Sequence, residues 1–212
     1  DAVEVEDQMR SIPSLAMEQL QSQVQVGETT WINTMLGKLW PLIDKGLETY
    51  VHEKLTPRIQ EKLPKFLQGT HFESFTLGTK SLSVDQVRLL DSPEGVELHL
   101  QLNLDGSPEI SIKTPAARVG IKKLTFHGNL VIRLDPLMNS TPVVGGAVVY
   151  FLEPPKIGIE FSGLGSFLQF PGFAMVVQQA VDNLIADKVL YPNMIGNVMG
   201  HTMDPVEYLS PK

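Results

Sequence analysis

The sequence Val96-Glu-Leu-His-Leu-Gln-Leu-Asn-Leu-Asp105 decides the fold class, because apolar and polar residues alternate along its whole length. Successive side chains of a β-strand point to opposite faces, so this pattern predicts a strand with one buried and one solvated face. The same period of two recurs in residues 82–89, 124–134 and 157–161. The middle of the chain is therefore expected to form an antiparallel sheet with one apolar face.

Three local features modify these expected strands. The alternation changes phase at Asp85-Gln86, which predicts a β-bulge. Gly128 falls on the apolar face, where it would thin the wall or let the strand bend. Asp105-Gly106 predicts a turn, after which residues 110–112 continue the apolar pattern.

The segment before the strands has the period of an amphipathic helix. Apolar residues recur at intervals of three and four from Ile32 to Leu55, and Thr29 or Thr30 can cap the first turn. Pro41 should kink this helix or set a second start.

Two further helices are expected from their boundary residues. Thr56-Pro57 is typical of a cap followed by proline at the first helical position, and this short helix should end near Leu63. A second long helix should open near Pro171-Gly172 and end near Tyr191-Pro192. Helices at both ends of a strand block give an α+β fold.

Composition and charge exclude several classes of protein. The 212 residues are 42% hydrophobic and 19% charged, which is typical of one or two globular domains. The formal net charge of −7 disfavours a general electrostatic grip on nucleic acid or anionic lipid. The chain has no cysteine, no apolar stretch long enough to span a bilayer and no leader sequence, so we expect a fragment from a reducing compartment.

Patterns that support catalysis or metal binding are not found in the sequence. No two histidines stand four residues apart, none has a carboxylate at metal-ligand spacing, and there is no Gly-x-Ser-x-Gly motif. Aromatic residues, 7% of the chain, are not interleaved with basic ones. We therefore expect no enzyme activity, no metal, no cofactor and no nucleic-acid partner.

Several short motifs occur in a fixed order. They are Trp31-Ile32-Asn33, Trp40-Pro41, Gly128 to Leu137, Pro142-Val-Val-Gly145, Glu153-Pro154-Pro155, Pro171-Gly172 and Leu190-Tyr191-Pro192-Asn193. Each motif alone is weak, but the ordered set over about residues 29–200 resembles the SMP domain (synaptotagmin-like, mitochondrial and lipid-binding protein) of the tubular lipid-binding superfamily. The resemblance is closest to extended synaptotagmins, tricalbins and plant synaptotagmins.

The resemblance implies an elongated half-tube of strongly curved antiparallel sheet, whose flanking helices enclose a lengthwise apolar groove. It implies that the domain binds glycerolipids or phospholipids in this groove and transfers them between apposed membranes at endoplasmic reticulum contact sites. The alternative is a non-transporting dimerisation or tethering domain whose core is filled by side chains. A third reading, a secreted lipid-binding relative, is disfavoured because cysteines and a signal peptide are absent.

The alternating faces nominate the residues that would line the groove. They are Leu98, Leu100, Leu102, Ile110, Ile112, Phe126, Leu130, Ile132, Val149, Phe151, Ile157, Ile159, Phe161, Val177, Val181 and Leu184. Glutamate at both Leu100 and Ile132 should abolish lipid uptake by an open groove, and should unfold a filled core. Both Trp31 and Trp40 are expected in the core rather than against lipid.

The resemblance also predicts organisation and location. Residues 1–27 would be a linker or loosely ordered helix, residues 28–200 the lipid-binding domain, and residues 201–212 a linker toward a further domain. Membrane attachment would come from flanking segments, and the first helix would lie at the tip where two copies form a homodimer. The expected location is the cytosolic face of the endoplasmic reticulum at contact sites, with the plasma membrane as the opposite membrane.

Overall fold

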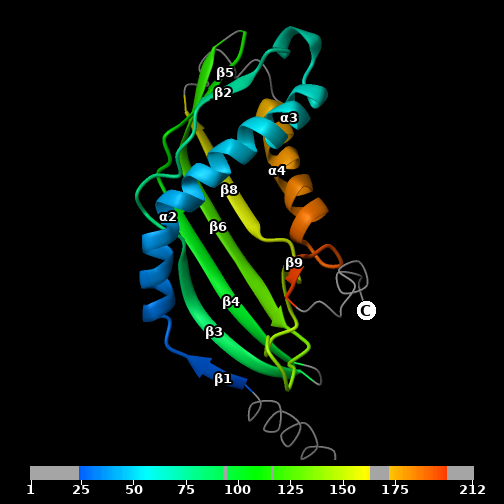
Figure 1. Ribbon diagram of the computed structural model, residues 1–212. Coiled ribbons are helices and arrows are strands. Elements are labelled where there is room, and N and C mark those ends of the chain that lie inside the picture. Colours follow the sequence, from blue (N-terminus) through cyan, green and yellow to red (C-terminus); the bar gives the residue numbers. More distant parts are fainter. Residues whose placement is uncertain (1–23, 93–94, 116, 163–171, 200–212) are drawn as a thin grey trace, which may run out of the picture.

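The computed structural model of this chain describes residues 24–92, 95–115, 117–162 and 172–199. A 17-residue strand lies in the centre of its sheet (Figure 1). This strand, β6 (Arg118–Leu134), is paired twice along each edge. Its partners are β4 (Gly95–Gly106) and β5 (Ile110–Lys113) on one edge, and β8 (Lys156–Ser162) and β7 (Gly146–Phe151) on the other.

The turn expected at Asp105-Gly106 does not fold the chain back on itself. Both β4 and β5 pair antiparallel with β6, so residues 107–109 carry the chain onward along the same edge. The sheet is completed by β1 (Val24–Gly27), β2 (His71–Ser74), β3 (Ser83–Ser92) and β9 (Ile195–Val198). Residues 24–27, placed by the sequence in the N-terminal segment, thus belong to the sheet, whereas residues 1–23 and 200–212 lie outside the described residues.

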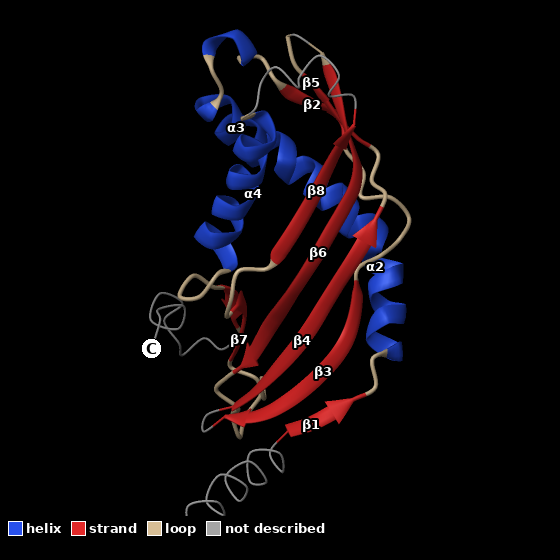
Figure 2. Cartoon of the chain, turned by 180° about the vertical axis from the view of Figure 1, so that it is seen from behind, coloured by secondary structure: helices blue, strands red, loops and turns tan. Residues whose placement is uncertain are grey.

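The predicted bulge in β3 is confirmed. The register against β4 shifts between Val84 and Gln86, which is the place where the sequence changes phase. The nine strands within the described residues pair antiparallel in one sheet that does not close on itself. Seen from behind in Figure 2, the strands form a long twisted wall with the helices on its other side.

The first helical region is continuous where the sequence predicts a new start. Helix α2 (Thr30–Tyr50) runs through a π-helical segment, η1 (Val51–Leu55), into α3 (Thr56–Lys62). The Thr56 hydroxyl donates to the carbonyl oxygen of Val51 at 3.0 Å, so it bridges the wide turn instead of capping a helix. Pro41 lies inside α2, whose axis changes direction part-way along its length (Figure 1).

Helix α4 (Phe173–Val189) begins after Gly172 and ends before Tyr191, as the sequence predicts. Figures 1 and 2 show that α2 crosses one face of the sheet diagonally, while α4 runs along the opposite flank of the same face. These two helices therefore lie on the same face of the sheet (Figure 1).

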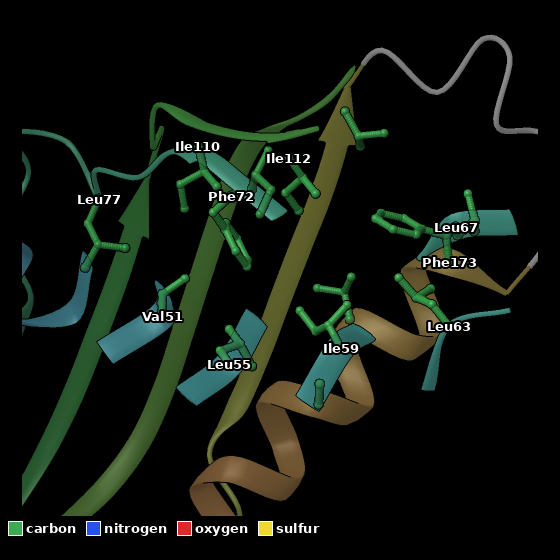
Figure 3. Packing of buried hydrophobic residues seen from close by; sticks show 14 of the residues in the cluster. Val51, Leu55, Ile59, Leu63, Leu67, Phe72, Leu77, Ile110, Ile112 and Phe173 are labelled. Atoms are coloured by element: carbon green, nitrogen blue, oxygen red, sulfur yellow. The ribbon is translucent and has the colours of Figure 1, made fainter. Parts of the chain in front are cut away.

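The buried core divides into two clusters on this face. One cluster lies where η1, α3, the short turn η2 (Lys65–Leu67), β2, β5 and the start of α4 meet, and Figure 3 shows its side chains converging from these segments. The other joins the first half of α2 to β3, β4 and β7, and its buried members are Ile32, Val84, Val87, Leu100, Leu102 and Phe151.

The opposite face of the sheet carries a small cluster that the alternation does not predict. Val131 sits on the polar phase of β6 yet is 0% exposed, and Val148 and Tyr150 of β7 share its face. Partly buried Met194 and Val198 pack against this cluster from the last part of the described chain. Near this point the sheet is therefore apolar on both sides.

The tryptophan motif has a polar explanation. The Asn33 side chain donates to the Val84 carbonyl oxygen at 2.9 Å and accepts from the Val84 N–H at 2.7 Å. Trp40 is 5% exposed and its indole N–H donates to the Gly78 carbonyl oxygen at 2.8 Å, so its predicted core position is confirmed. Trp31 is 63% exposed, so the core position predicted for it is wrong, because it lies on the helix face turned away from the sheet.

Candidate functional site

An open cavity of about 720 Å³ lies between the second half of α2, α4 and the sheet. Its wall is apolar apart from two side chains, the Tyr50 phenol and the Lys188 ammonium. The lining residues are Leu47, Tyr50, Val51, Leu55, Phe72, Phe75, Leu77, Ile110, Ile121, Leu124, Ile157, Ile159, Val177, Val181, Leu184, Ile185, Lys188, Val189 and Ile195.

Local structure explains why these side chains share one space. On α4, Val177, Val181 and Leu184 recur at intervals of four and three, which places them on one face of the helix. On the sheet, Leu124 stands directly opposite Ile159, so both side chains project to the same face. The apolar side chains of α4 on one side and those of the sheet on the other therefore form one continuous apolar surface.

The cavity wall is chemically suited to hold hydrocarbon chains. Within the described ranges no three His, Asp or Glu side chains lie together so that they could hold a metal ion. Lys188, the one charged residue of the lining, is exposed to solvent and lies in the last turn of α4. The cavity is suited to an apolar ligand, with a single positive charge available at its margin.

The structure brings six of the sixteen nominated residues to the cavity wall. They are Ile110, Ile157, Ile159, Val177, Val181 and Leu184. Contact of these residues with lipid stays a prediction.

The other ten nominated residues do not line this cavity. Ile112 and Phe161 belong to the cluster around α3, and Val149 pairs with Ile132 and Ile195 at the β7 edge. Seven pack into the cluster below the first half of α2, namely Leu98, Leu100, Leu102, Phe126, Leu130, Ile132 and Phe151. Leu100, Leu102 and Phe151 are buried here and the other four are partly exposed, so glutamate at buried Leu100 alone would unfold the domain under either hypothesis.

Sequence reasoning missed the contribution of α2 and η1. Leu47, Val51 and Leu55 continue the helical stripe that was read from the sequence, so extending the site to that helix would have found them. Phe75 and Leu77 lie in an irregular segment without periodicity, which offers no signal of this kind.

Comparison with known proteins agrees with this geometry. The sequence profile of the family described as "Synaptotagmin-like mitochondrial-lipid-binding domain" matches residues 25–199, which is most of the chain. The chain belongs to this SMP family. The family predicted from the ordered motifs is therefore confirmed.

Extended synaptotagmins are similar in sequence to this SMP domain. It is 29% identical over 178 residues to extended synaptotagmin-3 of Mus musculus, covering 80% of this chain and 19% of the relative. It is 26% identical over 174 residues to extended synaptotagmin-1 of Mus musculus, covering 80% of this chain and 16% of the relative. The chain thus spans less than a fifth of the length of these curated relatives.

Two solved structures share the fold. A structure of the SMP, C2A and C2B domains of extended synaptotagmin 2 superposes with a TM-score of 0.64 at 23% identity, covering 86% of this chain and 40% of that one. The crystal structure of Mmm1 superposes with a TM-score of 0.60 at 14% identity, covering 93% of this chain and 96% of that one. These likenesses confirm the predicted α+β half-tube of antiparallel sheet.

Proposed function

We propose that this SMP domain takes up glycerolipids, phospholipids in particular, in the apolar cavity and transfers them between two apposed membranes. The observation that carries the proposal is the open space of about 720 Å³ walled by apolar side chains in a member of a family described as lipid-binding. This volume falls in the range of about 300–1,000 Å³ that is usual for ligand sites.

Lipid transfer of this kind needs a cavity as apolar as the lipid tails, and it needs no catalytic group. Each methylene that leaves water gains about 0.8 kcal/mol, so a free diacyl lipid in water is prohibitively unfavourable. A wall of Leu, Ile and Val side chains is about as apolar as the lipid tails themselves, so movement from membrane to cavity is nearly neutral. The domain then lowers the barrier to crossing water and leaves the direction to the lipid gradient.

The place of action and the partners belong to the same proposal. We place the domain on the cytosolic face of the endoplasmic reticulum at contact sites, opposite the plasma membrane, as a homodimer. The support is the kinship with extended synaptotagmins and the fold shared with Mmm1. Because the net charge of −7 does not favour anionic membranes, attachment would be through other segments of the protein.

A cavity-filling variant tests the proposal. Val181 is half-buried on α4 and lines the cavity, so the indole of Val181→Trp should fill part of the open space. Ala174→Trp, on the exposed side of the same helix, is the matched control. The assay is native mass spectrometry with lipid extraction, followed by transfer between phosphatidylcholine liposomes.

Wild type and Ala174→Trp should carry phospholipid and transfer it, whereas Val181→Trp should lose most of both activities and keep its melting temperature. Equal lipid uptake by Val181→Trp would remove the cavity from the mechanism.

The tethering alternative has one observation in its favour. The cluster that contains Leu100, Leu102 and Phe151 shows that part of the apolar face is filled by side chains. A wild-type domain that purifies without lipid, takes up none from liposomes and still self-associates would support a tether and overturn lipid transfer.

A further inference from the structure

A second hollow, of about 450 Å³, opens beside the end of α4. It is lined by residues 187–188 and 192–196, and it shares Lys188 and Ile195 with the apolar cavity. The two spaces therefore adjoin at these two residues. An apolar cavity that adjoins a hollow lined partly by polar side chains matches the plan of a glycerophospholipid, with its chains in one part and its headgroup in the other.

The charges around the hollow leave one cation available. Asp187 is held by Arg58, whose guanidinium lies 2.9 Å from its carboxylate and donates a hydrogen bond to it. Lys188 has no carboxylate within 4.0 Å in the part of the chain that the structure describes. Arg58, Asp187 and Lys188 together therefore carry one net positive charge, in a protein whose net charge is −7.

The end of the helix is already closed by other groups. The Asn193 side-chain amide donates to the Ala186 carbonyl oxygen at 2.9 Å, and the Leu190 N–H donates to the Ile185 carbonyl oxygen at 3.2 Å. A lysine in a last helical turn also interacts favourably with the helix dipole, and Lys62 has this position in α3. Lys62 lines neither the cavity nor this hollow, so what distinguishes Lys188 is its place between them.

We infer that Lys188 and the adjoining hollow form the headgroup subsite, in which the ammonium group contacts the phosphodiester of a glycerophospholipid. This inference rests on the proposed lipid-binding function and deepens it. An ammonium donates charge-assisted hydrogen bonds to phosphate oxygens, whereas the hydroxyl of diacylglycerol offers no charge. Lys188 therefore makes the domain select phospholipid over diacylglycerol of the same chain length.

The test is a competition between the two lipid classes. The domain is incubated with phosphatidylcholine vesicles that contain a minor fraction of diacylglycerol with the same acyl chains. It is then re-isolated, and the ratio of the two bound lipids is measured by extraction and mass spectrometry. The variants are Lys188→Ala, Lys188→Arg to restore the charge, and Lys62→Ala as the control at the end of another helix.

Lys188→Ala should lower the ratio of phospholipid to diacylglycerol about two- to five-fold, the range of an exposed ion pair. Lys188→Arg and Lys62→Ala should keep the wild-type ratio, and high salt should bring wild type toward Lys188→Ala because it screens the charge.

Two outcomes would overturn the inference. If wild type binds both lipids and Lys188→Ala leaves the ratio unchanged, the headgroup subsite is refuted and the cavity still binds lipid. If wild type extracts neither lipid, the proposed function fails and the subsite fails with it.

Discussion

Replacing Asn33 by alanine should destabilise the domain by about 2–3 kcal/mol. The Asn33 amide makes two hydrogen bonds to the backbone of Val84, at 2.9 and 2.7 Å, and so joins α2 to the start of β3. The register against β4 shifts just after Val84, so the bulge loosens regular pairing at this point. The alanine variant leaves the Val84 N–H and carbonyl without this partner beneath the helix.

The magnitude follows from the two bonds and their burial. A typical intramolecular hydrogen bond contributes about 0.5–1.5 kcal/mol, and an unsatisfied buried group costs about 1–3 kcal/mol. Val84 is among the most buried residues of the domain, so water cannot fully replace the lost amide. The measurement is urea unfolding followed by circular dichroism, with wild type and variant compared at their midpoints.

The neighbouring residue provides the control. The Thr34 hydroxyl donates to the Thr30 carbonyl oxygen at 2.9 Å, in an exposed bond within one helical turn. Thr34→Ala should therefore change the unfolding free energy by less than about 0.5 kcal/mol. If Asn33→Ala costs no more than Thr34→Ala, the bonds between α2 and β3 do not hold the helix, and this explanation of the motif is refuted.

Three further predictions follow from packing and charge. Leu100→Ala should cost about 2–5 kcal/mol by urea unfolding and leave lipid uptake unchanged, because Leu100 packs in the filled cluster away from the cavity. Gly128→Ala should cost about 1–3 kcal/mol in the same assay, because its new Cβ would lie 2.9 Å from Pro155 Cβ. Burial, assisted by Glu97 and opposed by Arg133, raises the pKa of the Tyr150 phenol above 10.0. The folded protein therefore holds this proton more tightly than the unfolded chain, and the free energy of unfolding falls as pH rises through the raised pKa. In Tyr150→Phe this alkaline loss of unfolding free energy should be smaller, and an equal loss would contradict the assignment.

The strands and the long helices could be predicted because their periodicity is local. The alternation of residues 96–105 corresponds to β4 without error, and the phase change at Asp85-Gln86 corresponds to the bulge. What failed depends on partners distant in sequence. Nothing near Asp105-Gly106 indicates that β5 pairs with β6 instead of β4, because that choice is made by a strand further along the chain.

The sequence allowed us to predict the apolar face of the sheet but not which part of that face lines the cavity. Alternation places Leu100 and Ile159 on the same apolar side of the sheet, but only the helices decide that one is covered and the other lines the cavity. Val131 shows the converse, since its position on the polar phase concealed a cluster on the other face. Periodicity specifies which way a side chain points and carries no information about what it meets.

Polar contacts of α2 fix the helix to the sheet and help to keep its first half in place. Asn33, Trp40 and Asp44 make five hydrogen bonds to residues 76–78 and 84, which hold α2 to the start of β3 and to the segment that precedes it. A lipid chain that entered there would exchange apolar protein contacts for apolar lipid contacts, which is nearly neutral. It would also break these bonds, at about 1 kcal/mol each, with nothing to replace them. Entry of a lipid chain beneath Asn33 is therefore disfavoured, whereas the open cavity is available without breaking these bonds.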